Sequence, residues 1–358
     1  MVCAVMPRKG PGSGVLRSLV TLGVAAAALV AMSGCDALPS PSPSPSASPE
    51  YVSSYEPPAP TELAPLRGTT VEAGSLAHAS VSAKIDNHWD ARPQLGLERT
   101  DIVFEELVEG GITRYVAVWH SDVPEELGPI RSIRPMDPDI ASPFGGIIFY
   151  AGGQPQFVSM MQSTPVYNAI HGQGDTAAYM YRSGDRSAPH NVIVKAQEFL
   201  AAHAELPAPR QQFAFSLDAA SSTAAKEGSP TGALQLTFST GFRPAWTYDA
   251  ASARYLRSQD GAPDLDSSGA QLAATNVVTI RVPITHGTGV PKTELLGSGE
   301  AWVTTGGGTV HGSWHKAAAG DAITLLGDDG IVLRLGAGNT WVELVPLEGS
   351  VEIIPPAA

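Results

Sequence analysis

Residues 102–120 read Ile-Val-Phe-Glu-Glu-Leu-Val-Glu-Gly-Gly-Ile-Thr-Arg-Tyr-Val-Ala-Val-Trp-His and predict a β-hairpin. Two runs rich in β-branched and other apolar residues flank Gly110-Gly111, as expected for two strands joined by a tight turn. A Gly-Gly pair suits a type I′ turn, since both central positions of that turn need a positive φ. We therefore expect the chain to reverse here and the two strands to pair.

The predicted hairpin also assigns its charged side chains to faces of the sheet. If the two glycines alone form the turn, Glu109 lies opposite Ile112 and Glu105 lies opposite Val116. Side chains alternate between faces along a strand, so Glu105, Glu109 and Arg114 are expected on one face. Two interpretations stay open: a structural ion-pair network, or an anchored carboxylate beside an arginine that is available to a ligand.

The sequence on either side of the hairpin mixes strands and helices up to about residue 208. Val81–Asp86 and Gly145–Tyr150 have the apolar character of strands, whereas residues 154–162 and 196–203 have that of helices. Such a mixture predicts a mixed α/β subdomain over residues 66–208.

Residues 209–358 differ, because short β-prone runs recur there with Gly or Asp-Gly between most of them. This spacing predicts an antiparallel, β-rich C-terminal subdomain, so the whole fold is expected to be α+β or α/β. The strands expected are Leu234–Phe238, Trp246–Asp249, Arg254–Arg257, Asn276–Val282, Glu300–Thr304, Thr309–Lys316, Ala322–Leu326, Ile331–Leu335 and Thr340–Val345.

The N-terminus has three parts in the order that protein export requires. Arg8, Lys9 and Arg17 supply positive charge, and the apolar run that follows is shorter than the roughly 20 residues of a membrane span. Met-Ser-Gly-Cys at residues 32–35 then places small residues before a cysteine that can carry a lipid. Residues 1–34 are therefore predicted to be a lipoprotein signal peptide, with Cys35 as the lipidated residue. The alternative is a transmembrane helix with a coincidental cysteine.

Residues 35–65 are predicted to form the lipid anchor and a Pro/Ser-rich spacer. Such a segment cannot bury enough apolar surface to offset its ordering entropy, and its prolines keep it extended. Acyl chains such as palmitate on Cys35 would hold the protein at the extracytoplasmic face of the bacterial plasma membrane.

The charge and the cysteines limit the partners. The sequence has 22 Lys+Arg and 35 Asp+Glu, a net charge of −13. Three of these bases precede Cys35, so 19 remain after cleavage and the net charge becomes −16. This acidic balance argues against nucleic acid as a partner.

Cys3 leaves with the signal peptide, so no disulfide is expected. The expected partners are the plasma membrane, through the lipid anchor, and a cell-wall polymer or an envelope protein.

Polar and charged side chains gather where the predicted strands end, in turns rich in Gly and Pro. In open α/β sheets, ligands bind on such loops beyond the carboxyl ends of strands. Guanidinium groups suit the bidentate capture of carboxylate or phosphate, so arginines in these loops favour an anion site. The candidate ligand-binding residues are Asp86, Asn87, Arg92, Arg114, Arg131, Arg134, Arg182 and Asn191.

Acid–base chemistry has three candidates, Glu105, Glu109 and His190. Histidine titrates near neutral pH, which makes His190 the best general-base candidate. Asp86 could orient it or contact a ligand hydroxyl, but nothing in the sequence shows that the two residues meet. The alternative is a histidine that bonds only the backbone of a turn. The sequence has no zinc-binding helix, phosphate loop or dinucleotide fingerprint, so we expect no metal and no cofactor.

Several motifs follow one another in a fixed order along the first half of the chain. They are Asp86-Asn87, residues 91–97, Asp101-Ile102-Val103, residues 108–114, residues 128–135, Ala151-Gly152-Gly153, Tyr181-Arg182 and Pro189-His190-Asn191. In this order they resemble the YerB-like bacterial lipoproteins, a family defined by a domain of unknown function, DUF3048.

The similarity to this family extends from about Ala83 to Pro346 and is weaker in the second half. It implies an N-terminal α/β subdomain and a C-terminal β-rich one in a secreted lipoprotein, and it implies no established activity. The Glu105-Glu106 pair departs from the family pattern of one acid followed by a small residue. Which of these two carboxylates matters therefore stays open.

Three functions remain in competition. The first is a non-catalytic binding protein that holds an anionic or polyhydroxyl envelope ligand through Arg114, Arg131 and Arg134. The second is a hydrolase or transferase of envelope glycan, which requires paired carboxylates about 5–10 Å apart. The third is a scaffold for a membrane-protein partner, which requires a large exposed apolar patch.

Overall fold

The computed structural model describes residues 54–287 and 289–357. The predicted signal peptide, Cys35 and most of the predicted spacer lie outside these residues. The chain divides into two compact units, residues 1–56 and 57–358, and the fold described here is that of the second. Within the described ranges, no helix has the length and apolar character needed to cross a membrane.

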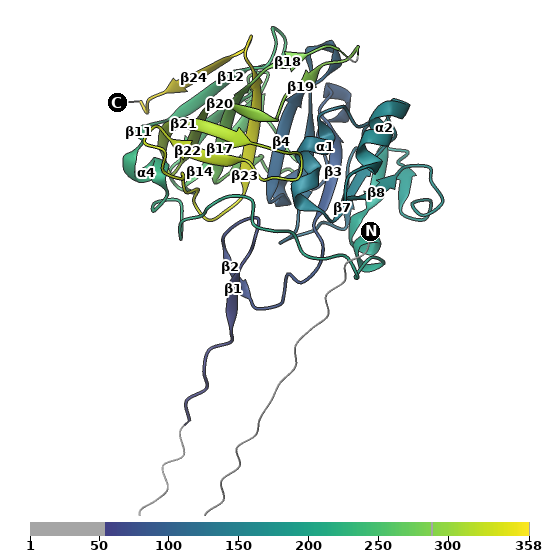
Figure 1. Ribbon diagram of the computed structural model, residues 1–358, viewed down its shortest axis with the longest axis horizontal. Helices are drawn as coiled ribbons and strands as arrows, with labels where there is room; N and C mark the ends of the chain where they lie inside the picture. Colours follow the sequence, from purple (N-terminus) through teal and green to yellow (C-terminus); the bar gives the residue numbers. More distant parts are fainter. Residues whose placement is uncertain (1–53, 288, 358) are drawn as a thin grey trace, which may run out of the picture. The chain divides into compact units, whose positions relative to one another are not determined.

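An 11-stranded sheet forms the centre of this unit (Figure 1). It contains strands from both halves of the sequence, because β23 pairs with β17 on one side and with β4 on the other, in both cases in parallel. The spatial order is β11 (Ser229–Pro230), β21 (Gly308–Lys316), β20 (Gly297–Thr305), β17 (Asn276–Val282), β23 (Thr340–Pro346), β4 (Ile102–Leu107), β5 (Thr113–Trp119), β3 (Val81–Asp86), β7 (Ile147–Tyr150) and β8 (Tyr167–Ile170), with β22 (Thr324–Gly327) beside β21.

A second sheet packs its inner face against the large one. Its strands in order are β15 (Ala262–Pro263), β14 (Arg254–Gln259), β13 (Ala245–Asp249), β12 (Ala233–Thr237) and β24 (Ser350–Ile354), and β16 (Ala273–Ala274) pairs with β14. Three small sheets complete the strands: β1 (Thr61–Leu63) with β2 (Thr70–Glu72), β18 (Ile284–Thr285) with β19 (Lys292–Thr293), and β6 (Glu126–Leu127), β10 (Val192–Lys195) and β9 (Met180–Arg182).

Short helices cover the sheet around β7 on both faces. Phe157 and Met161 of α2 pack with Ile148 and Tyr150 of β7, whereas Phe199 of α3 packs with the opposite face. Alternation along β7 requires this arrangement, since neighbouring side chains point to opposite faces. The helices are α1 (Asp137–Ala141), α2 (Pro155–Gln162), α3 (Ala196–Ala201) and α4 (Thr223–Glu227), and the 3-10 turns are η1 (Trp89–Ala91), η2 (Leu97–Arg99), η3 (Glu109–Gly111) and η4 (Ser142–Phe144).

The core between the two sheets is aromatic. Trp341 of β23 meets Trp246 of β13 and Tyr115 of β5 edge-on, with ring centroids 5.2 Å apart in both pairs. All three side chains are buried. Aromatic pairs in this arrangement stabilise a core beyond the burial of their area, by about 0.5–1.5 kcal/mol each.

The fold is mixed and strand-rich, as the sequence predicted in outline. One predicted strand is wrong: Ile331–Leu335 forms only isolated bridges, from Val332 to Leu326 and from Leu335 to Phe215. These two contacts go to different segments, so no continuous ladder can form. The boundary at residue 208 between two subdomains stays a prediction.

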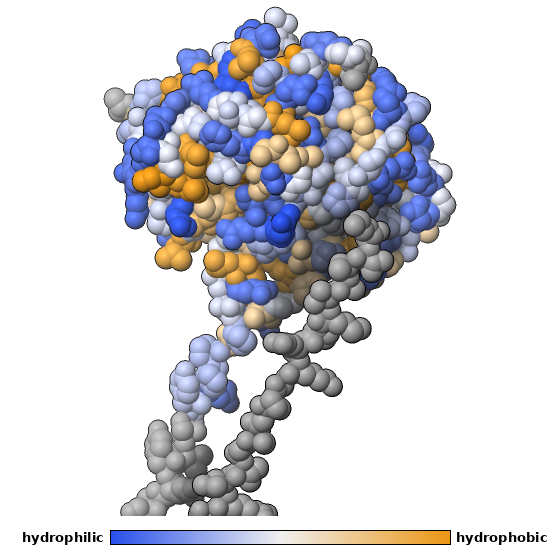
Figure 2. Space-filling view, viewed as in Figure 1, coloured by the Kyte–Doolittle hydropathy of each residue, from blue (hydrophilic) through white to orange (hydrophobic). Residues whose placement is uncertain are grey.

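On the face seen in Figure 2, hydrophobic residues of the described chain lie in several separate groups among polar ones. Single exposed hydrophobic residues are normal on protein surfaces, whereas an extended patch marks a binding surface. The face in view therefore does not favour the scaffold hypothesis.

Candidate functional site

The carboxyl ends of four parallel strands meet at one edge of the large sheet. β3, β7 and β8 run parallel, and β4 runs parallel to β3 because both are antiparallel to β5 between them. The amino end of β5 lies at the same edge. We define the strand-end site as the residues that this edge brings together: Asp86, His88, Glu109, Arg114, Arg131, Arg134 and His190.

The β4–β5 hairpin turns differently from the prediction. Both glycines have positive φ, 76° and 73°, as expected. However, the backbone N–H of Val108 donates to the carbonyl oxygen of Ile112 at 2.9 Å, so three residues form the loop instead of two. Compared with the predicted two-residue loop, one extra loop residue shifts the pairing by one position, so every side chain of one strand points to the opposite face.

This shift separates Glu105 from Arg114. Arg114 lies opposite Glu106, and Glu105 lies opposite Tyr115, which faces the aromatic core. The prediction that Glu105, Glu109 and Arg114 share one face is therefore wrong for Glu105.

Asp86 and His190 do meet at the strand-end site, although 104 residues separate them. Nδ1 of His190 lies 2.5 Å from Oδ2 of Asp86, and Nε of Arg131 lies 3.0 Å from the same oxygen. Backbone bonds bring Arg131 there, because residues 129–131 run alongside the end of β3 and bond Asp86 and Lys84. The carboxylate of Asp86 thus orients the ring of His190.

Arg114 and Arg134 extend the site toward the hairpin tip. Nε of Arg134 donates to Glu109 at 2.7 Å, and Nη1 of Arg114 donates to the carbonyl oxygen of Ser132 at 2.9 Å. Burial, together with the charges of Arg134 and Arg131, lowers the pKa of Arg114 to about 10. Partial burial opposes ionisation of Glu109, but the bond from Arg134, a backbone bond and the charges of Arg134 and Arg114 together outweigh it and lower the pKa of this carboxyl group.

The segment after Asp86 adds residues that were not predicted from the sequence. The imidazole rings of His88 and His190 stack with centroids 4.6 Å apart and an interplanar angle of 16°. Trp89 packs against His88, with ring centroids 3.9 Å apart, and is 64% exposed. Their position directly after the Asp86-Asn87 motif was the one available signal.

Arg182 and Asn191 bond each other across the β9–β10 pair, with Nη1 of Arg182 donating to Oδ1 of Asn191 at 2.8 Å. Asn191 also donates to the carbonyl oxygen of Ser183. These two residues therefore brace the loop that carries His190, and among the described residues no hydrogen bond or ion pair joins them to the arginines of the strand-end site.

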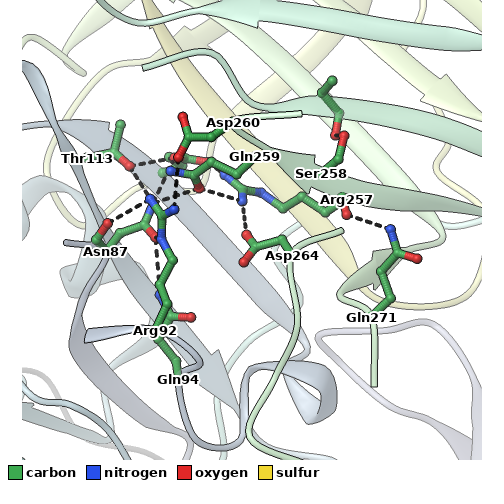
Figure 3. Close-up of polar contacts among 12 residues, drawn as sticks. Asn87, Arg92, Gln94, Thr113, Arg257, Ser258, Gln259, Asp260, Asp264 and Gln271 are labelled. Carbon is green, nitrogen blue, oxygen red and sulfur yellow. Dashed lines mark hydrogen bonds and ion pairs between the residues drawn. The ribbon is translucent and has the colours of Figure 1, made fainter. Parts of the chain in front are cut away.

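Asn87 and Arg92 belong to a connection between the two halves of the sequence, in which Asn87 is buried and Arg92 is half-buried (Figure 3). Nδ2 of Asn87 donates to Thr113 at 2.8 Å and to Gln259 at 3.3 Å, and its Oδ1 accepts from Arg92 at 3.0 Å. Arg92 also pairs with Asp260 at 3.2 Å. The arrangement suits a structural role more than ligand binding.

Glu105 is also part of this interior. Nη2 of Arg257 donates to Glu105 at 2.6 Å, and Nη1 of Arg257 bonds Asp264. Glu343 lies opposite Glu105 on the neighbouring strand and accepts from the indole N–H of Trp246 at 2.7 Å. All four charged side chains are buried, so Glu105 is not accessible as an acid or base to a polymeric substrate.

A second buried network lies on the opposite face of the sheet. Lys84 bonds both Glu106 and Asp137, and all three residues are fully buried. Burial lowers the pKa of Lys84 to about 8, although Asp137 opposes the shift. The sequence left open which of Glu105 and Glu106 matters. In the structure each carboxylate pairs with a buried cation on its own face of the sheet: Glu105 with Arg257, and Glu106 with Lys84.

Comparison with known proteins matches both halves of the chain. Residues 66–208 match the N-terminal domain of the DUF3048 proteins of unknown function, and residues 234–342 match the C-terminal domain. The putative lipoprotein YerB of Bacillus subtilis strain 168 is 26% identical over 289 residues, which cover 79% of this chain and 86% of YerB.

The fold is also similar to a solved structure. The crystal structure of the YerB protein from Bacillus subtilis matches with a TM-score of 0.70 and 24% identity, covering 81% of this chain and 99% of that chain. With both domains matched in order, this chain belongs to the DUF3048 family, whose function is unknown.

Proposed function

We propose that this protein is a lipid-anchored, extracytoplasmic binding protein whose strand-end site holds an anionic or polyhydroxyl envelope ligand. Arg131 and Arg134 are the residues that would contact the ligand, and Arg114 would supply positive charge beneath them. A stretch of anionic wall polymer, with regularly spaced phosphates or carboxylates, is the ligand class that fits best.

The observation that carries the proposal is the unbalanced charge of Arg114. Arg131 pairs with Asp86 and Arg134 pairs with Glu109, but no carboxylate of the described residues lies within ion-pair distance of Arg114. The residue is only 5% exposed, and its Nε has no hydrogen-bond partner within the described chain. Asp86 and Glu109 act on the charge of Arg114 only from beyond ion-pair distance. A buried cation without a carboxylate in direct contact is costly, so an anion bound at this edge would relieve the cost.

The hypothesis of a glycan hydrolase has less support. Glycan hydrolysis needs two accessible carboxyl groups, but Glu105 is buried against Arg257, and Asp86 and Glu109 are each held by an arginine.

The net charge of the chain supports the anion site. The sequence is acidic, with a net charge of −13, so a local group of arginines is stronger evidence for an anion site than it would be in a basic protein.

Anchoring at the membrane rests on the sequence around Cys35 and on the similarity to a putative lipoprotein. Attachment by acyl chains would place the strand-end site outside the cytoplasm, within reach of wall polymers.

The test is equilibrium binding of the full-length protein, in detergent, to purified anionic wall polymer and to a neutral glycan. We expect the anionic polymer alone to bind, and Arg131→Ala to weaken its affinity at least tenfold. The matched control is Arg334→Ala, which removes an exposed arginine beside β22, six strands away across the large sheet. Equal affinity of both variants and the parent chain would refute the proposal.

A further inference from the structure

We infer that His88, Asp90 and His190 form a binding site for one divalent transition-metal ion, with Zn²⁺ as the best match and water as the remaining ligand. One ligand atom of each residue lies within 4.8 Å of the other two. Two imidazoles and one carboxylate form the set that zinc keeps in sites with an open position, whereas Ca²⁺ and Mg²⁺ prefer oxygen ligands alone.

His190 already has the geometry of a metal ligand. Its Nδ1 is held by Asp86 at 2.5 Å, which leaves Nε2 as the nitrogen for the metal. Histidines that bind metals nearly always give their other nitrogen to a carboxylate or carbonyl group, which fixes the tautomer and the orientation of the ring. Asp86 is itself buried and fixed by Arg131, so the support is rigid.

His88 and Asp90 complete the set from one short turn. Nδ1 of His88 lies 3.6 Å from Oδ2 of Asp90. Two ligand atoms on one tetrahedral zinc ion, each at about 2.0–2.1 Å from the metal, are roughly 3.3 Å apart. The pair itself needs only a small closure, in which Nδ1 of His88 exchanges its hydrogen bond from the backbone N–H of Asp90 for the metal. The ring of His88 must also turn out of its stack on His190, since two nearly parallel rings cannot direct their nitrogen lone pairs at one ion.

The ion can reach this site from solvent. Asp90 is exposed, with 61% of its side chain accessible, and it lines an open pocket of about 550 Å³. The charged groups that line this pocket or hold His190 are balanced, because Asp86, Asp90 and Asp185 are matched in number by Arg92, Arg131 and Arg186. A divalent cation would thus be accommodated beside the arginines.

This inference differs from the expectation drawn from the sequence, which was that the protein binds no metal. The metal ligands His88 and His190 belong to the strand-end site, but they are not the arginines that would bind the anion, Arg114, Arg131 and Arg134. The two can be tested separately.

The experiment is titration of the full-length, chelator-treated protein with Co²⁺, followed by the visible absorption of the bound ion and by its displacement with Zn²⁺. We expect one ion per chain. Asp90→Asn should weaken Co²⁺ binding at least tenfold, and because Asp90 is exposed this variant keeps the fold, which circular dichroism would verify. His88→Ala should have the same effect, whereas His286→Ala, at an exposed histidine, should bind as the parent chain does.

Absence of the cobalt absorption, or unchanged affinity in Asp90→Asn and His88→Ala, would overturn the metal site. Anion binding measured on the same chelator-treated sample separates the outcomes. Anion binding without metal binding removes the metal site alone, and metal binding without anion binding removes the proposed function alone.

Discussion

Replacing Glu343 by Gln tests how the buried network between the two sheets holds its charge. Glu343 lies opposite Glu105 on the neighbouring strand, and Arg257 is the cation that lies against Glu105 and Asp264. Burial raises the pKa of Glu343 well above its ordinary value, and the charge of Glu105 adds to this effect. We therefore expect Glu343 to keep its proton to a higher pH than an exposed carboxyl group does, and a Gln side chain to keep the bond from Trp246.

The effect of this substitution should depend on pH in a defined direction. A carboxyl group whose pKa is raised on folding stabilises the fold fully below its unfolded pKa and loses this contribution as the pH rises through its folded pKa. The glutamine variant has no such loss. Each pH unit between the two values corresponds to about 1.4 kcal/mol, so the variant should gain stability over the parent chain as the pH rises from 5 toward the folded pKa, at up to this rate.

Urea unfolding followed by tryptophan fluorescence measures this difference, since Trp246 and Trp341 lie in the same core. Glu352→Gln is the matched control, because Glu352 is exposed on β24 and its removal should leave the difference flat. A constant difference between Glu343→Gln and the parent chain from pH 5 to 7 would show that Glu343 is ionised in the fold, contrary to this reasoning.

Two further substitutions test other parts of the fold by the same urea measurement. Lys84→Met leaves the buried carboxylates of Glu106 and Asp137 without their cation and should destabilise the protein by about 3–5 kcal/mol; a loss below 1 kcal/mol would mean that the pair does not depend on Lys84. Ser222→Ala removes the oxygen that accepts from the backbone N–H of Ala225 at the start of α4 and should cost about 1 kcal/mol, and no measurable change would argue against that cap.

Local patterns predicted the strands of the sheet well. The apolar runs at β3, β4, β5 and β7 were identified within two residues, because each is bounded by glycine or polar turn residues. The pairing register of β4 and β5 was not predicted correctly. It depended on whether the hairpin loop has two residues or three, and the Gly-Gly pair is compatible with both.

The buried charges could not be predicted, because their partners lie far apart in the sequence. Glu105 and Arg257 are 152 residues apart, and the alternating pattern of β14 resembles that of a half-exposed strand. The pairing of Asp86 with His190 was considered from the sequence, but only the fold brings them together. His88 was missed, since a histidine after two polar residues is not distinguished from an ordinary turn residue.

Hydrogen exchange of the full-length protein, measured by mass spectrometry with and without anionic wall polymer, tests the central claim most directly. The account predicts slower exchange in residues 108–114 and 128–135, which carry Arg114, Arg131 and Arg134, and loss of this protection in Arg131→Ala. Protection confined to other segments, such as residues 324–335 around β22, would contradict it.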